Sequence, residues 1–271
     1  MIVLNSVLHD SRVLREANSL LSKGYKVKIL GLLDKKIDRH DSAIEIELIY
    51  VWSRYRLPRN HVGWIIKYFE FCVKCTLKII KSKPYIIHAH DLNALVPAYF
   101  GSLFSKAKVI YDSHELYTER IENSNTIKNR VWRFVEKKLL HKVSAIIAAN
   151  KSRARIMKND YGAPYLPTVI MNIPSVQSIS RSFLFQDYIK SRGVKNIDQK
   201  EIALYQGVIS HKRSLDILIR SVKSWNQKIL LILMGYGDSS YINYLRNLIY
   251  AFDLQQRVFF HPAVPSHKLL Q

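Results

Sequence analysis

The sequence predicts an α/β fold of two domains, each built around a parallel sheet. Short apolar runs alternate with helix-length amphipathic segments from the first residue onward, which is the pattern of parallel strands joined by crossover helices. At 271 residues the chain is longer than the roughly 150 residues of an average single domain. The alternation stops in a mixed, polar stretch at residues 176–200, which we interpret as a linker region.

The first domain spans residues 1–175 and begins with an apolar run of strand length. The helix that follows has Asp10 or Ser11 as its N-cap and Gly24 at its C-terminal end. The expected strands of this domain are 1–7, 25–33, 44–52, 83–91, 107–115, 144–150 and 168–174. Its expected helices are 10–24, 64–80, 92–104, 129–143 and 151–162.

The second domain, residues 201–271, repeats this alternation until the chain stops. Its expected strands are 201–209, 228–237 and 257–264, and its expected helices are 214–225 and 241–252. A parallel sheet needs helices on both faces, because a half-covered sheet exposes apolar surface. We therefore expect an incomplete second domain and a C-terminally truncated protein.

Charge is the unusual feature of the composition. The 42 Lys and Arg residues against 21 Asp and Glu give a formal net charge of +21. Such an excess indicates an anionic partner, either a phosphate-bearing ligand, a nucleic acid or an acidic lipid surface, with a merely solubilising surface as the alternative. Basic residues are frequent at 128–158, and Trp132 and Phe134 among them favour contact with an anionic membrane.

The sequence offers no sign of a membrane span or a secretion signal. The longest apolar run, ILLILM at 229–234, is strand-sized, and the N-terminus lacks a basic region followed by a cleavage site. Cys72 and Cys75 lie within the helix expected at 64–80, which favours two reduced thiols over a redox or zinc pair. We expect a cytoplasmic protein that is peripheral at the inner face of the membrane.

Polar side chains gather where strands of the first domain end. Ligands of parallel sheets bind beyond the carboxyl ends of the strands. The residues expected there are His90, Asp91, Asp112, His114, Glu115 and Asn150. We expect these side chains to line a ligand site.

The motif HAHD leaves a metal site open as a second interpretation. His88 and His90 lie two residues apart and therefore on one face of a strand. Asp112 and His114 are the geometric candidates for further ligands. We favour the simpler arrangement, in which one histidine is interior, the other is at the cleft, and no metal is bound.

Two loops of the second domain have the composition of phosphate-binding loops. Gly207 ends a strand, and Lys212 and Arg213 open the next helix, where cations oppose the helix dipole unless an anion is present. Gly235 and Gly237 follow the next strand as half of a G-x-G-x-x-G fingerprint. An ordinary tight turn and a solvated basic turn remain the alternatives.

Taken together, these motifs resemble the family-4 type of retaining glycosyltransferases. The similar stretches are DSRVLREANSLLSKGYKVKILG, IIHAHDLNALVPAY, VIYDSHELYTE, LYQGVISHKRSLDILI and LILMGYGDSSYINYLRNLI. The resemblance implies a GT-B fold of two Rossmann-like domains. It also implies transfer of a sugar from a nucleoside-diphosphate donor with retained anomeric configuration, and no cofactor or metal.

The resemblance also assigns roles to residues. It implies that His114 lies near the transferred sugar and the acceptor. We therefore expect His114 to be catalytic with Asp112 and Glu115 orienting it, and His90, Asp91 and Asn150 to bind substrate. The resemblance further implies that the diphosphate is bound by Gly207, Lys212, Arg213, Gly235 and Gly237. Two departures stand out. Val208 occupies the place of an arginine that usually helps to hold the diphosphate. A glutamate pair of the family would follow Gln271, so activity of this chain is in question.

Four hypotheses about function follow. The first is a glycosyltransferase that acts on a glycan or lipid-linked acceptor of polysaccharide or lipopolysaccharide assembly, with an anionic membrane as a further partner. The second is a non-catalytic remnant that binds a nucleotide or a partner. A nucleic-acid-binding protein is disfavoured because the charge is spread over many helices, and a dehydrogenase would need the full dinucleotide fingerprint.

Overall fold

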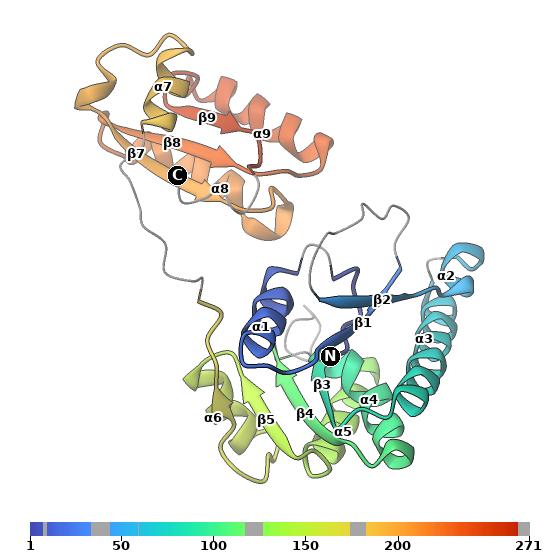
Figure 1. Ribbon diagram of the computed structural model, residues 1–271. Helices are drawn as coiled ribbons and strands as arrows, with labels where there is room; N and C mark the ends of the chain where they lie inside the picture. Colours follow the sequence, from blue (N-terminus) through green and yellow to red (C-terminus); the bar gives the residue numbers. More distant parts are fainter. Residues whose placement is uncertain (8–9, 34–43, 59, 117–126, 174–182, 265–271) are drawn as a thin grey trace. The chain divides into compact units, whose positions relative to one another are not determined.

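The computed structural model describes residues 1–7, 10–33, 44–58, 60–116, 127–173 and 183–264. The chain divides into two compact units, Met1–Pro174 and Ser175–Gln271, and both are layered α/β structures (Figure 1).

The first unit contains a fully parallel sheet. Its strands are β1 (Lys28–Leu32), β2 (Glu45–Ile49), β3 (Ile86–His90), β4 (Lys108–Ser113), β5 (Ala145–Ala148) and β6 (Thr168–Val169). β1 pairs with β2, and β3 to β6 pair in sequence order. The chain start joins the two groups, because Ile2 bridges Leu30 of β1 on one side and Ala89 of β3 on the other. The first residues therefore fill a strand position through isolated bridges, where the sequence analysis expects a full strand over 1–7.

A backbone constraint ends that first extended segment. Val7 is buried and has φ +63°, a left-handed conformation that β-branched residues rarely adopt. Its side chain packs against the backbone of β1 at Gly31. A Cβ on Gly31 would lie 2.4 Å from Val7 Cγ2, so the glycine leaves the space that this loop occupies.

The helices of the first unit follow the predicted order. They are α1 (Ser11–Leu21), α2 (Trp52–Arg56), α3 (His61–Ser82), α4 (Asp91–Ser105), α5 (Ile127–Leu140) and α6 (Lys151–Asn159). Asp10 caps α1 by accepting a hydrogen bond from the Val13 amide at 3.2 Å, and Gly24 beyond the helix has φ +83°. α3 contains both thiols: Cys75 is buried, Cys72 is half-buried, and neither is in a disulfide.

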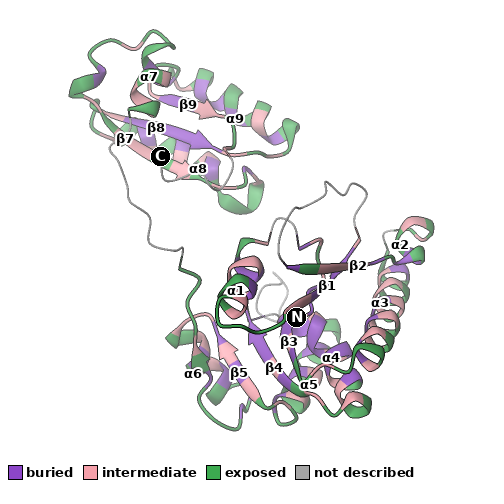
Figure 2. Cartoon of the chain, viewed as in Figure 1, coloured by how far each residue is buried: buried purple, intermediate pink, exposed green. Residues whose placement is uncertain are grey.

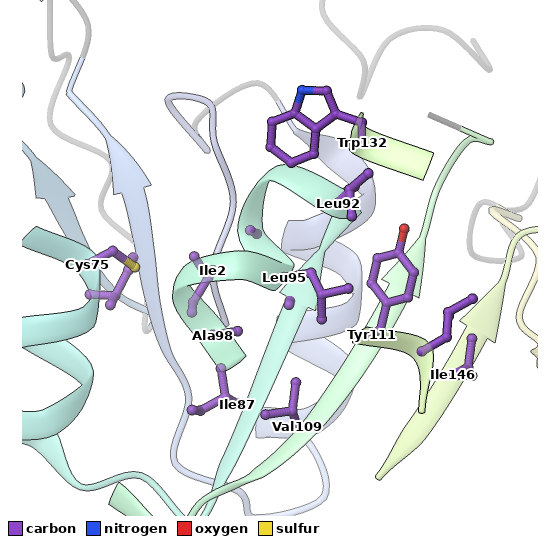
Figure 3. Packing of buried hydrophobic residues seen from close by; sticks show 14 of the residues in the cluster. Ile2, Cys75, Ile87, Leu92, Leu95, Ala98, Val109, Tyr111, Trp132 and Ile146 are labelled. Atoms are coloured by element: carbon purple, nitrogen blue, oxygen red, sulfur yellow. The ribbon is translucent and has the colours of Figure 1, made fainter. Parts of the chain in front are cut away.

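The main core of the first unit lies on the face of the sheet that α3, α4, α5 and α6 cover. Strand residues such as Ile87, Val109 and Tyr111 alternate toward these helices and meet Leu92 and Leu95 of α4 (Figure 3). β3 and β4 are mostly buried (Figure 2). α1 packs on the opposite face through Val13 and Ala17. Alternate residues of each strand therefore face two different environments.

Trp132 corrects one expectation. Its basic neighbours predict a position on the helix surface, but its side chain is 7% exposed and packs edge-on against Trp64 and Tyr68 of α3. Phe134, two residues later on α5, is 62% exposed. The many basic residues of α5 make its buried face hard to recognise in the sequence, although the 3.6-residue period places that face on one side of the helix.

The second unit is a three-layer structure around a parallel sheet in the order β7-β8-β9. Its elements are α7 (Leu184–Lys190), β7 (Glu201–Gln206), α8 (Leu215–Ser221), β8 (Ile229–Met234), α9 (Ser239–Ala251) and β9 (Val258–His261). α8 and α9 cover one face of the sheet. α7 and a 3-10 turn at Ile197–Gln199 cover the other.

The linker predicted at 176–200 therefore needs correction in its second half. Ile189 of α7 and Ile197 of the turn are fully or almost fully buried against the sheet of the second unit. The stretch is polar overall, so the few apolar anchors that attach it to the sheet are not periodic enough to stand out in the sequence. Within the described residues, no helix combines the length and hydropathy that a membrane crossing requires.

Candidate functional site

The strand ends of the first unit bring most of the predicted residues together. β3 and β4 pair in parallel with His90 beside Asp112, so both side chains project to the same face of the sheet. His88 lies two residues before His90 on that face, and the two imidazole rings stack with their centroids 4.3 Å apart. This is the face that α1 covers, and it carries charged and polar groups where the opposite face carries apolar ones.

α1 supplies the charges that meet these side chains. Arg12 and Glu16 are one helical turn apart, and the Arg12 Nε donates to Glu16 Oε1 at 3.0 Å. The Arg12 Nη2 donates to Asp112 Oδ1 at 2.9 Å. Arg12 thus binds one oxygen of each carboxylate and leaves the second oxygen of each turned toward the histidines. We call Arg12, Glu16, His88, His90 and Asp112 the buried polar cluster.

His114 follows β4 and lies against the buried polar cluster. Its Nε2 is 3.0 Å from His90 Nδ1 and 3.4 Å from Asp112 Oδ2. The Asp91 carboxylate accepts a hydrogen bond from the His114 amide at 3.0 Å, and the Arg153 guanidinium donates to the His114 carbonyl oxygen. The backbone of His114 is therefore held from two sides and its ring from a third.

Burial and neighbouring charges shift the pKa values of these groups in different directions. Burial raises the pKa of Asp112, but the three histidines that face it outweigh burial and hold its pKa well below the usual range. Burial together with the neighbouring Asp112 charge raises the pKa of Glu16. Burial lowers the pKa of His90 to about 3. Burial opposes the charged form of His114 too, but Asp112 and Asp91 outweigh it and raise its pKa.

Asp91 occupies a strained backbone position. It follows β3 directly and has φ +64°, a left-handed conformation in a non-glycine residue. Its carboxylate reaches the end of the neighbouring strand β4, because it accepts a hydrogen bond from the His114 amide there. Burial raises the pKa of Asp91. The constraint places a carboxylate beside His114 rather than out in solvent.

A cavity of about 620 Å³ opens beside His114. It is lined by Asn5, Ser6, Asp10, Ser11, Arg12, His114, Glu115, Ala149, Asn150, Arg153 and Asn172. The predicted residues His114, Glu115 and Asn150 therefore share this cavity, while Asp112 and His90 are buried beneath His114. Asn150 also caps α6, because its Oδ1 accepts from the Arg153 amide at 2.8 Å.

The glycines predicted to bind diphosphate in the second unit have a packing reason of their own. A Cβ on Gly235 would lie 1.8 Å from the Gly207 carbonyl oxygen, and one on Gly237 would lie 2.1 Å from the Ile209 carbonyl oxygen. The loops after β7 and β8 therefore run in backbone contact, which only glycine permits. That contact fits the ordinary-turn alternative, and nucleotide binding by these glycines stays a prediction.

Lys212 and Arg213 are exposed in a 3-10 turn, His211–Arg213, that precedes α8. No ion pair joins either side chain to another part of the chain that the structure describes. They lie in the same unit as Gly207 and Gly235. Their predicted role at a diphosphate likewise stays a prediction.

Three charged residues of the first unit belong to the site although their sequence context does not predict it. Arg12 and Glu16 lie one helical turn apart, next to the apolar positions of α1, which is the one signal that they face the sheet. Arg153 is indistinguishable in sequence from the other basic residues of α6. Its contact with the His114 carbonyl depends on how α6 packs against β5 and β6, which no local pattern predicts.

Comparison with known proteins identifies a family. The family model "Glycosyltransferase Family 4" matches residues 11–172, which include α1 and the whole set of predicted residues in the first unit. No curated protein sequence matches the chain significantly.

Solved glycosyltransferase structures share the fold. HepE from Anabaena, solved in complex with UDP and glucose, has 16% identity and a TM-score of 0.67, and the match covers 97% of this chain and 68% of HepE. Sucrose-phosphate synthase from Thermosynechococcus elongatus has 14% identity, a TM-score of 0.66 and coverages of 93% and 64%. The lipopolysaccharide outer core galactosyltransferase WaaB has 12% identity, a TM-score of 0.62 and coverages of 98% and 68%. The predicted fold class, GT-B with parallel sheets in two Rossmann-like domains, is confirmed.

Proposed function

The chain belongs to glycosyltransferase family 4, and we propose that it binds a nucleoside-diphosphate sugar and transfers the sugar, with retained configuration, to a glycan acceptor. The observation that carries the proposal is the position of His114. It lies at the end of β4, is fixed by charged groups beneath it, and lines a cavity of about 620 Å³. The complexes of HepE with UDP and UDP-glucose support a nucleotide-sugar as the donor.

The contacts of His114 suit a group that positions a sugar. Its Nε2 is engaged by His90 and Asp112. Its Nδ1 is 3.9 Å from Asp91 Oδ2, beyond hydrogen-bond distance, and is therefore the ring nitrogen left for a molecule in the cavity. A histidine held in this way hydrogen-bonds a sugar hydroxyl or passes a proton without reorganising. Glu115 and Asn150 line the same cavity and supply further polar groups.

Lys212 and Arg213 are the proposed partners of the donor diphosphate. Departure of a nucleoside diphosphate develops negative charge on its oxygens, which nearby cations stabilise. Arg also binds phosphate oxygens through two parallel hydrogen bonds. Both side chains are exposed and therefore available to a ligand. No cofactor enters this proposal.

A membrane-linked acceptor is part of the proposal because of the surface of α3. Apolar side chains at helical spacing are 41–68% exposed along this helix: Val62, Ile65, Ile66, Phe69, Val73 and Leu77. The adjoining α2 adds Trp52, which is 53% exposed, and the basic residues Arg54 and Arg56. An apolar stripe flanked by Trp and Arg is typical of a helix that lies in the interface of an anionic membrane. On this proposal the protein acts at the cytoplasmic face of the membrane.

The donor is tested by thermal unfolding of this chain with UDP, GDP and ADP, and with NAD as the probe for a dehydrogenase. At about 100 times its Kd, one nucleoside diphosphate should add about 2.7 kcal/mol to the stability. Replacing both Lys212 and Arg213 by Ala should remove the shift, whereas Lys195→Ala, an exposed cation of the same unit, should leave it. A shift with NAD alone would contradict the proposal.

Transfer is tested with the nucleotide-sugar that binds and with His114→Ala. This variant should lose transfer yet retain the nucleotide-dependent shift, and His141→Ala, an exposed histidine after α5, should retain both. Nucleotide binding without transfer in the unaltered chain would favour the non-catalytic alternative.

Membrane contact is tested by sedimentation with vesicles of phosphatidylcholine with or without phosphatidylglycerol. Binding should need the anionic lipid and should fall in Ile65→Glu/Phe69→Glu. Ile217→Glu, at an exposed apolar position of the second unit, should bind like the unaltered chain. Equal binding by all three proteins would remove α3 from the proposal.

A further inference from the structure

Four side chains of the first unit direct one ligand atom each into a common space. Glu16 comes from α1, His88 and His90 come from β3, and Asp112 comes from β4. The four atoms, a carboxylate oxygen or ring nitrogen from each, all lie within 4.8 Å of one another. Glycosyl transfer as proposed above uses His114 at the cavity and gives this group beneath it no chemical task.

These atoms lack the hydrogen bonds that buried polar atoms normally have. Glu16 Oε2, His88 Nε2 and Asp112 Oδ2 are buried and have no hydrogen-bond partner in the described part of the chain. Buried polar atoms are nearly always paired, and a group of unpaired ones points to an ion or water between them. All three belong to the set of four converging residues.

The distances between the atoms match the ligand sphere of a small divalent ion. His88 Nε2 is 3.8 Å from Glu16 Oε2 and 3.5 Å from Asp112 Oδ2. His90 Nδ1 is 3.8 Å from Glu16 Oε2 and 3.6 Å from Asp112 Oδ2, and on binding an ion it would exchange its 3.0 Å contact with His114 Nε2 for the metal. Four ligands at about 2.0–2.2 Å from a tetrahedral Zn²⁺ are about 3.3–3.6 Å from one another. These four His–carboxylate distances therefore need to shorten by at most about half an ångström, and the remaining pairs lie within 4.8 Å of each other.

Arg12 holds the two carboxylates in the orientation that such a site needs. It binds Glu16 Oε1 and Asp112 Oδ1 and so turns the other oxygen of each toward the histidines. Hydrogen bonds of this kind to the far atoms of metal ligands are the usual support of a metal site. Two carboxylates against one guanidinium leave a net negative charge, which attracts a cation.

We propose that Glu16, His88, His90 and Asp112 bind one divalent transition-metal ion, with Zn²⁺ preferred for its tetrahedral geometry and its affinity for imidazole and carboxylate. The ion joins α1 to β3 and β4 directly beneath His114. The half-buried His88 and Glu16 provide the route by which the ion enters. This corrects the expectation that one of the two HAHD histidines faces the cleft, since both face α1.

The first test measures metal binding by the full chain prepared without a polyhistidine tag. Dialysis against Zn²⁺ followed by elemental analysis should give one zinc per chain. Co²⁺ in place of zinc should give the intense visible absorption of a tetrahedral site. Absence of stoichiometric zinc, or a weak octahedral cobalt spectrum, would overturn the proposal and leave a hydrogen-bonded cluster that positions His114.

Variants locate the ion. His88→Gln and Glu16→Gln should each weaken zinc binding by more than the about 10–100-fold that loss of a supporting hydrogen bond costs. His141→Gln, an exposed histidine of the same unit, should bind zinc like the unaltered chain. If zinc binding survives in both cluster variants, the ion is held elsewhere and the assignment is wrong. If either variant fails to fold, the cobalt spectrum of the unaltered chain decides.

Discussion

The strand ends of the two units hold their predicted residues in opposite ways. In the first unit, Asp112 and His90 are buried and bound by charged or polar neighbours. In the second, Gly207 and Gly235 are in backbone contact and Lys212 is exposed. The first site is therefore organised by the fold itself before any ligand is present. The second combines two loops in close backbone contact with exposed cationic side chains, which are free to rearrange around a ligand.

The largest expected effect comes from removing a buried charge in the first unit. Asp112→Ala should lower the free energy of unfolding of this unit by about 3–5 kcal/mol, because it removes the more deeply buried of the two carboxylates that pair with the Arg12 guanidinium. Urea unfolding followed by tryptophan fluorescence in a Trp225→Phe background measures the first unit, which contains the other tryptophans.

The control for that experiment is Asp160→Ala, an exposed carboxylate at the end of α6, which should change stability by less than about 0.5 kcal/mol. A loss as small for Asp112→Ala would show that solvent or a shifted Arg12 compensates, and the contrast between the units would disappear.

The second effect tests the backbone frame of the second unit. Gly235→Ala should cost about 1–3 kcal/mol or more, because its Cβ would lie 1.8 Å from the Gly207 carbonyl oxygen and the loops must separate. Hydrogen exchange of the β8 amides should rise accordingly, whereas Ser239→Ala at the exposed start of α9 should leave it unchanged. Unchanged exchange in the glycine variant would mean that the two loops are not in contact.

A third, smaller effect comes from a carboxylate away from both sites. Burial raises the pKa of Glu70, but hydrogen bonds from Lys74 and from the Ser53 and Trp52 amides outweigh it and lower the pKa to about 2. Glu70→Ala should therefore cost about 1 kcal/mol at neutral pH, as loss of a helix cap does.

The pH dependence gives the sign of this effect. Because the pKa of Glu70 is lower in the folded state, its ionised carboxylate stabilises that state at any pH above the unfolded-state pKa near 4.5. This contribution is lost as the pH falls toward about 2. The stability difference between Glu70→Ala and the unaltered chain should shrink over that range. A difference that does not change with pH would assign the effect to packing of the side chain.

The smallest effect is expected for the exposed cations. Replacing Lys212 and Arg213 together by Ala should change the stability of the unliganded chain by less than about 0.5 kcal/mol, since neither side chain is buried. Thermal unfolding without nucleotide measures this. A marked loss of stability would mean that these residues support the fold, and the contrast with Asp112 would no longer hold.

Local patterns predict most of the architecture. The cap at Asp10 and the period of α1 are both visible in the sequence, as is the two-residue alternation that puts His88 and His90 on one face. Strand ends such as Asp91, Asp112 and His114 follow from the general rule for parallel sheets, and they do lie together.

What the sequence does not reveal is which surfaces meet. Arg12 and Glu16 become part of the site only because α1 packs across β3 and β4. Trp132 is buried because α5 turns that side toward α3, although its neighbours are basic. The anchors Ile189 and Ile197 are separated by polar residues, so their burial depends on the sheet that they cover. Each of these contacts is tertiary and has no local signature.

The loop at Val7 has a consequence for how this chain can evolve. Because a Cβ at position 31 would lie 2.4 Å from Val7 Cγ2, a smaller residue 7 removes the closest of its contacts, and the Asn5 carbonyl oxygen at 3.0 Å then limits the new side chain to a small one. Exchange of Val7 for Gly also relieves a left-handed conformation that costs a β-branched residue about 1–2 kcal/mol. A change to a smaller residue at position 7 is therefore expected to precede any substitution of Gly31.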